Sequence, residues 1–246
     1  METEDTTSRE RPSHDFARPL PEYVDWVAAV LIALGGLGLA VGGSALTFVV
    51  NRGLLEEGVE TGQVTVVGLE GELTDAEALV VAERIVDWTG IGLVVTGIAL
   101  VAFAVGYVVV RHRAHGRAGP DQPPESSRAY AVAGAVATGV LSFIPFSPVL
   151  GGGIAGYLEH YDGGRSVRVG ALAGFLAMVP AVSTLAFVAV GLFAGLSAVP
   201  AAGLEVVVFL AMLLAVLFVA AYGTGLGALG GYVGRRLGDS DRQSGV

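Results

Sequence analysis

The chain has 246 residues, of which 53% are hydrophobic and only 15% charged, with a mean hydropathy of +0.66. Soluble domains usually carry about 25% charged residues, so this composition indicates long apolar segments that span a bilayer. The chain contains no cysteine, which excludes disulfides, thiolate catalysis and cysteine-ligated metal sites.

The charged residues are unusual in kind. All 14 basic residues are arginine, and 23 acidic residues give a net charge of -9. In composition, such an acidic, lysine-free chain rich in alanine, valine and glycine resembles proteins of extremely halophilic archaea. In molar salt the Debye length falls to ~3 Å, so a crowded acidic surface repels itself little.

Residues 1–22 are polar and rich in acids and prolines, which predicts a disordered cytoplasmic tail. No apolar run begins before Asp25, so this segment does not resemble a signal peptide. Tyr23 and Trp26 follow where interfacial aromatic anchors are expected.

Residues 23–112 are predicted to form a two-span module. The spans are about Val27 to Val50 and Thr89 to Val110, and the acidic segment 51–88 between them is predicted to be external. Within this segment, Gly62 to Glu72 alternates weakly and suggests a short hairpin. Thr74 and Glu77 have the spacing of a capping box, which predicts a helix that runs into the second span.

Residues 113–128 are predicted to be a cytoplasmic linker rich in arginine and proline. A glycine-rich membrane domain follows over residues 129–236, with spans at about 169–196 and 205–234 and a polar tail at 237–246. Its first segment, 129–157, carries no charge but is broken by Pro145, Pro148 and the run Gly151 to Gly153. Three threadings are open for this segment: a re-entrant hairpin, two short spans or one kinked span.

The distribution of arginine favours the hairpin. Four arginines lie in 111–128, two in 158–168, none in 197–203 and three in 235–246. If 129–157 enters and returns, every arginine-rich segment and both termini are cytoplasmic, as the positive-inside rule requires. The sequence thus predicts an all-α membrane protein: a helical bundle of four full spans plus a Pro/Gly-broken helical hairpin, with a small acidic external loop or helix.

Small residues recur at four-residue spacing, which allows close packing of helices in a membrane. The pattern is compatible with packing inside one chain or with a homo-oligomer. The sets are Gly38/Gly42, Gly152/Gly156, Gly170/Gly174, Gly191/Gly195 and Gly223/Gly227/Gly231.

We expect no catalytic, cofactor-binding or metal-binding residues. The run Gly151 to Gly153 has no preceding strand and no following lysine, so it is not a phosphate-binding loop. Glu205 is read as a carboxylate in the first turn of a helix. The histidines are read as solvated or interfacial, and the few polar residues at depth as partners for backbone groups: His14, His112, His115 and His160; Ser142, Ser147, Ser183, Thr184, Tyr222 and Thr224.

The sequence FIPFSPVLGGGIAGYLEHYDGGRSVRVGALAGFLAMVP (Phe143 to Pro180) and the later GLGALGGYVGRR resemble a family of uncharacterised haloarchaeal membrane proteins, a domain of unknown function. The resemblance covers roughly residues 129–236. It implies a multi-span membrane protein and supplies no activity. The front half resembles a separate haloarchaeal two-span module.

The expected function is that of a non-enzymatic structural or envelope-associated component of the cell membrane. Its partners are the lipid bilayer and, through glycine-faced helices, a second copy. An acidic chain without interleaved basic and aromatic residues is not expected to bind nucleic acid. The alternative is a small channel or permease subunit that uses segment 143–157 as a discontinuous pathway element.

Overall fold

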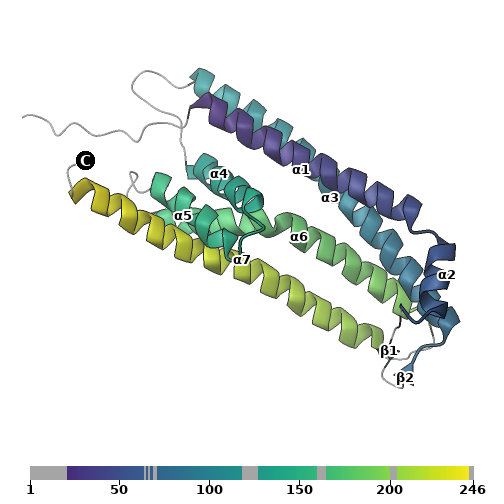
Figure 1. Cartoon of the computed structure of the whole chain (residues 1–246). Helices are drawn as coiled ribbons and strands as arrows, with labels where there is room; N and C mark the ends of the chain where they lie inside the picture. The colour runs from purple at the N-terminus through teal and green to yellow at the C-terminus, as the bar shows by residue number, and fades with distance from the viewer. Residues whose placement is uncertain are drawn as a thin grey trace, which may run out of the picture.

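The computed structural model describes residues 21–63, 65, 67–68, 71–117, 127–159, 165–199 and 204–243. The N-terminal tail before residue 21 lies outside the described residues, as do His14, His160 and most of the expected linker. Almost all of the described chain is helical, and the elements form an elongated bundle (Figure 1).

The front half contains two long helices that pack along each other. α1 covers Glu22–Val49 and α3 covers Asp75–Arg117. Between them lie the short helix α2 (Arg52–Glu60) and two strands, β1 (Val67–Gly68) and β2 (Gly71–Glu72). The strands pair antiparallel, with Val67 opposite Glu72, as the alternation in this segment predicted.

α3 begins with the predicted capping box. The backbone N–H of Thr74 donates to Glu77 Oε2 at 3.0 Å, and the Glu77 N–H donates to Thr74 Oγ1 at 3.4 Å. Two of the donors that a helix N-terminus leaves open are thereby satisfied. From there the helix runs through the second span without interruption, as expected, and ends only at Arg117.

The back half contains two short and two long helices. α4 covers Ser127–Val140 and α5 covers Ser147–Glu159. The long helices are α6 (Ser166–Leu196), which continues through Pro180, and α7 (Leu204–Gln243). The predicted break in segment 129–157 corresponds to the turn between α4 and α5.

Glycine residues allow the backbones of neighbouring helices to approach each other very closely. A Cβ atom added to Gly36 or Gly43 of α1 would come within 3.0 Å of α3, at Gly97 and Gly90. In the back half, Gly174 meets the backbone of Gly223, and Gly170 meets Gly227 and Gly231. Such close approach is how helices associate where lipid replaces water around them.

The two halves meet through α3 and α6. The ring of Trp88 stacks on that of Phe187, with the centroids 6.4 Å apart. Gly191 and Gly195 of α6 lie directly against α3, at Trp88 and Val81 respectively. Trp88 is therefore a packing residue between the halves, in addition to its place at the start of the predicted second span.

Within the described residues, four helices are long and apolar enough to cross a membrane: α1, α3, α6 and most of α7. Many of their large hydrophobic side chains are exposed, among them Leu34, Val41, Leu214 and Phe218. In water such a surface would be unfavourable, whereas in a bilayer it faces acyl chains. The structure thus fits an all-α membrane protein.

Most of the described arginines lie toward one end of the bundle, and most of the described acids toward the other. One end, called here the arginine-rich end, contains the start of α1, the ends of α3, α5 and α7, and the starts of α4 and α6. Its arginines are Arg111, Arg113, Arg117, Arg128, Arg165, Arg168, Arg235 and Arg236. The opposite end, called the acidic end, contains α2, the strands, the start of α3, the end of α6 and the start of α7 (Figure 1). Its described acids include Glu56, Glu57, Glu60, Asp75, Glu77, Glu83, Asp87 and Glu205.

Candidate functional site

A buried ion pair joins the first turns of α1 to the last turns of α3. Arg111 Nε donates to Asp25 Oδ2 at 2.8 Å, and the side chains of Arg111 and Asp25 are only 8% and 4% exposed. The hydroxyl of Tyr107, one turn before Arg111, donates to Asp25 Oδ1. Both carboxylate oxygens of Asp25 are therefore occupied by donors from α3.

A second buried carboxylate lies where the short helices begin and end. Glu159, the last residue of α5, is fully buried, and its Oε1 accepts a hydrogen bond from Ser127 Oγ at 2.8 Å. Ser127 is the first residue of α4, so this bond closes the two short helices onto each other. Ser166, the first residue of α6, is fully buried in the same part of the back half.

The sequence analysis did not identify these buried ionisable residues. Asp25 and Arg111 stand at the ends of the apolar runs and are separated by 86 residues, so each alone looks like a residue of the membrane interface. The spacing of Tyr107 and Arg111, one helical turn apart, was the available signal that they share a face. Glu159 followed an apolar helix and carried no comparable signal.

The broken segment 129–157 forms two antiparallel short helices. Gly134 of α4 packs against Gly151 and Ala155 of α5. Ser127 contacts Glu159 at the end of the pair that lies away from the connecting turn. The connecting turn is closed by local backbone bonds, including Ser142 N–H to Gly139 O and Ser147 N–H to Ile144 O, each 3.2 Å long. Phe146 has a φ of 65°, a left-handed conformation that ends the turn before Pro148.

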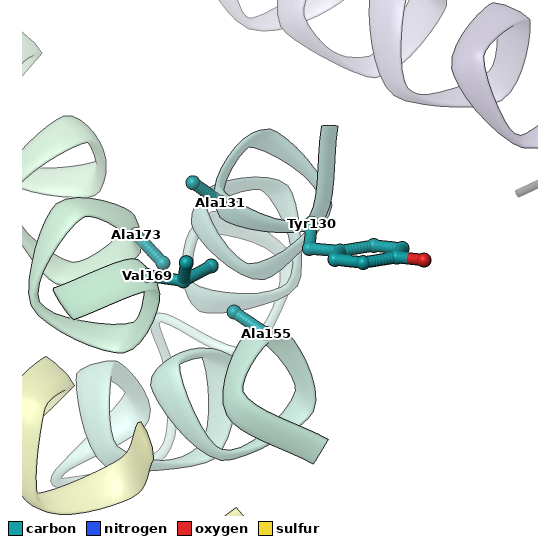
Figure 2. Packing of buried hydrophobic residues seen from close by; sticks show 5 residues of the cluster. All are labelled: Tyr130, Ala131, Ala155, Val169 and Ala173. Atoms are coloured by element: carbon teal, nitrogen blue, oxygen red, sulfur yellow. The ribbon is translucent and has the colours of Figure 1, made fainter. Parts of the chain in front are cut away.

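A small core fixes α4 and α5 against α6 (Figure 2). Tyr130, Ala131, Ala155, Val169 and Ala173 come from these three helices and form one buried cluster. Alanine at three of these positions keeps the helices close. The short pair is therefore held by packing as well as by the Ser127–Glu159 bond.

Within the broken segment, α5 packs most extensively against α7. A Cβ atom added to Gly152 or Gly156 would come within 3.0 Å of the backbone of Gly227 or Gly231. Gly230 and Gly234 of α7 approach Val149 and Gly153 of α5 equally closely. The glycine run of α5 thus serves as a contact surface for another helix.

An apolar cavity of about 500 Å³ lies between the two halves. Its walls come from α1, α3, α4 and α6, and its lining residues include Leu31, Gly35, Ala99, Phe103, Val132, Ala135, Gly139, Leu176 and Pro180. The hydroxyls of Thr96 and Ser183 also line it, and they hydrogen-bond each other at 2.8 Å. The cavity is partly open to the surroundings of the bundle.

The lining of this cavity bears on its contents. Its walls are mostly hydrocarbon, and its polar groups are the hydroxyls of Thr96 and Ser183. Water is not a good occupant, because apolar cavities stay dry. The lining is therefore suited to an apolar occupant.

The residues singled out from the sequence are scattered. His112 and His115 lie near the end of α3, which contains no proline and continues to Arg117. His112 contacts Glu22 at 3.2 Å and His115 contacts the backbone oxygen of Arg111 at 2.9 Å, both through Nδ1. Glu205 lies in the first turn of α7, as expected.

Two of the polar residues at depth bond to the backbone of their own helices. Thr184 and Thr224 donate to the carbonyl oxygens of Pro180 and Ala220, four residues before them. Ser183 instead contacts Thr96 of α3 across the halves. Among the described residues, no group of three or more His, Asp or Glu side chains is placed to hold a metal ion.

The back half of the chain matches a known protein family. Residues 128–237 match the model of a family described as a family of unknown function (DUF5518). The match begins in the first turn of α4 and includes α5, α6 and most of α7, and it leaves α1 to α3 outside. It confirms the resemblance of this region to a family without an assigned activity. No curated protein matches the chain, and neither does any solved structure.

Proposed function

We propose that this protein is a non-enzymatic structural component of the cell membrane, with four spans and a re-entrant hairpin formed by α4 and α5. The observation that carries the proposal is the backbone contact between α5 and α7, where Gly152 and Gly156 face Gly227 and Gly231. A segment packed this closely is suited to holding helices together.

The same contact argues against a conduction pathway through segment 143–157. A discontinuous transporter helix exposes its open backbone groups and helix ends to a polar cavity. Here the described glycines of α5 face a neighbouring helix, and the nearby cavity is lined almost entirely by hydrocarbon. The buried residues Asp25 and Arg111 form an ion pair with each other at one end of the bundle. They do not form a row of ionisable side chains that crosses the bundle, as a proton or ion pathway would need.

Helix length supports the re-entrant threading. The 14 residues of α4 extend ~21 Å and the 13 residues of α5 extend ~20 Å, both short of a hydrocarbon core ~30 Å thick. The pair starts and finishes at the arginine-rich end (Figure 1). By the positive-inside rule this end is cytoplasmic, together with both termini, and the acidic end is external.

Reconstitution into liposomes tests the proposed role. Proteoliposomes that contain the purified protein should pass common ions and osmolytes no faster than empty liposomes do. A solute flux that rises with the amount of protein, and that disappears when Gly152 is replaced by leucine, would instead establish the channel or permease reading.

The composition supports a haloarchaeal membrane as the setting. A net charge of -9 without a single lysine is unfavourable at low ionic strength and tolerable in molar salt. The acidic end concentrates this charge on α2, the strands and the start of α3.

Self-association through α1 is the second part of the proposal. Most glycine sets noted in the sequence are used inside the chain, but a Cβ atom added to Gly38 or Gly42 would meet nothing within 4 Å. This glycine face of α1 therefore supports close contact with a second copy.

A further inference from the structure

We propose that the cavity between α1, α3, α4 and α6 holds a hydrocarbon chain of a membrane lipid, and that the acidic phosphate head group of this lipid contacts Arg128. The site is assigned from the cavity, its lining and the arginine next to it. It is independent of whether the protein has a structural or a transport role.

The lining selects a hydrocarbon chain. Four helices contribute alanine, valine, leucine, glycine and phenylalanine to the walls. The two hydroxyls present, those of Thr96 and Ser183, already bond each other at 2.8 Å. A polar solute that entered the cavity would lose its hydrogen bonds to water and would find no hydrogen-bond partners in the lining. A hydrocarbon chain makes no hydrogen bonds and has none to lose.

The cavity lies alongside the short helix α4. α4 lines it from Val132 to Val140, where the helix ends. α1, α3 and α6 form the other walls, and the Thr96 and Ser183 hydroxyls bond each other in the lining. A second copy is a poor occupant, because a helix ~10 Å across would enter about 500 Å³ for only about one turn.

Arg128 gives the lipid an orientation. The cavity-lining residues of α4 are Val132, Ala135, Val136, Gly139 and Val140. Arg128 precedes Val132 by four residues, so it continues the same helix face one turn, or ~6 Å, toward the arginine-rich end. It is exposed there, where a phosphate group attached to the buried chain would lie.

The experiment measures lipid that stays bound to the full-length protein. The protein is purified in a mild detergent, incubated with an acidic phospholipid or a zwitterionic phospholipid of the same chains, and analysed by native mass spectrometry. The wild type should retain one lipid and prefer the acidic one.

Two substitutions separate the tail site from the head-group site. Ala135→Phe fills the cavity and should abolish retention of both lipids, whereas Ala211→Phe on the exposed face of α7 should leave retention unchanged. Arg128→Gln keeps the cavity and should lower the preference for the acidic lipid about fivefold.

Three results would overturn the proposal: equal retention in the wild type and Ala135→Phe, no retention in the wild type, or dimers without lipid in which Ala135→Phe disrupts the dimer. If Ala135→Phe lacks the helix content of the wild type, Arg128→Gln decides alone, and an unchanged lipid preference in that variant refutes the head-group contact.

Discussion

Arg111 Nε and Asp25 Oδ2 lie 2.8 Å apart, although 86 residues separate them in the chain. Their pairing ties the last turns of α3 to the first turns of α1, with the Tyr107 hydroxyl as a third member. Because both charges are buried, each depends on the other for its stability in the fold.

Removal of either charge should therefore destabilise the protein strongly. Asp25→Asn or Arg111→Gln should each lower the free energy of unfolding by about 3 kcal/mol, since the remaining charge is left buried and uncompensated. The double variant should lose clearly less than the sum. Denaturant titration in detergent micelles measures these values. Arg113→Gln, an exposed neighbour, is the control, and an equal loss in that variant would contradict the account.

A second prediction uses two glycines of α7 that are two residues apart. Gly227 lies directly against α6 and α5, whereas a Cβ atom at Gly225 would meet nothing within 4 Å. Gly227→Ala should lower the free energy of unfolding by roughly 1–3 kcal/mol because the helices must separate. Gly225→Ala should change it by less than about 0.5 kcal/mol. Similar effects of the two substitutions in the same titration would disprove the close contact.

The threading can be tested with single cysteines, since the chain contains none. Ser166, a natural choice from the sequence, is fully buried, so Val167 next to it is a better reporter. In sealed cells, an impermeant maleimide should label cysteine at Glu56 and Ser197 and leave cysteine at Val167 and Ser240 unlabelled. After permeabilisation all four positions should react, and labelling of Val167 in sealed cells would rule out the re-entrant hairpin.

Salt should stabilise the protein. The acidic end carries eight described acids and the described arginines Arg52 and Arg84, so screening relieves more repulsion than attraction there. We expect the thermal midpoint to rise between 0.1 and 3 M potassium chloride in the same detergent, as followed by circular dichroism. A midpoint that falls or stays constant would argue against adaptation to high salt.

Self-association should depend on Gly38. Replacement by leucine would block close approach of a second copy while meeting no atom of its own chain within 4 Å. Cross-linking in membranes should show a dimer for the wild type and a monomer for Gly38→Leu. Gly106→Leu is the matched control, because this glycine of α3 is equally open. Loss of the dimer in both variants, or in neither, would refute the glycine face of α1 as the interface.

The sequence predicted the spans well because uncharged apolar runs are a local signal. Thr74 and Glu77 likewise revealed the start of α3 through a spacing of three residues. The actual helix extends beyond the predicted second span at both sides, from Asp75 to Arg117, since helix formation continues into polar sequence where nothing breaks it. Hydropathy therefore predicts which residues lie within the membrane, but it does not predict where the helix ends.

The candidate sites were less accessible from the sequence. The Asp25–Arg111 pair depends on the register between α1 and α3, which is set by Gly36 and Gly43 against Gly97 and Gly90. The cavity depends on where α4 stops relative to α6. Both are properties of helix packing, and hydrophobic patterns in a single sequence do not contain them.

The length of α3 has a mechanical consequence. Its 43 residues extend ~65 Å, about twice the thickness of the hydrocarbon core, and the helix contains no proline. At one end it contacts α2 and at the other it is fastened to α1 by Arg111. In the proposed threading, one continuous helix therefore connects the external acidic end to the cytoplasmic arginine-rich end, so a displacement of one end can be passed to the other along α3.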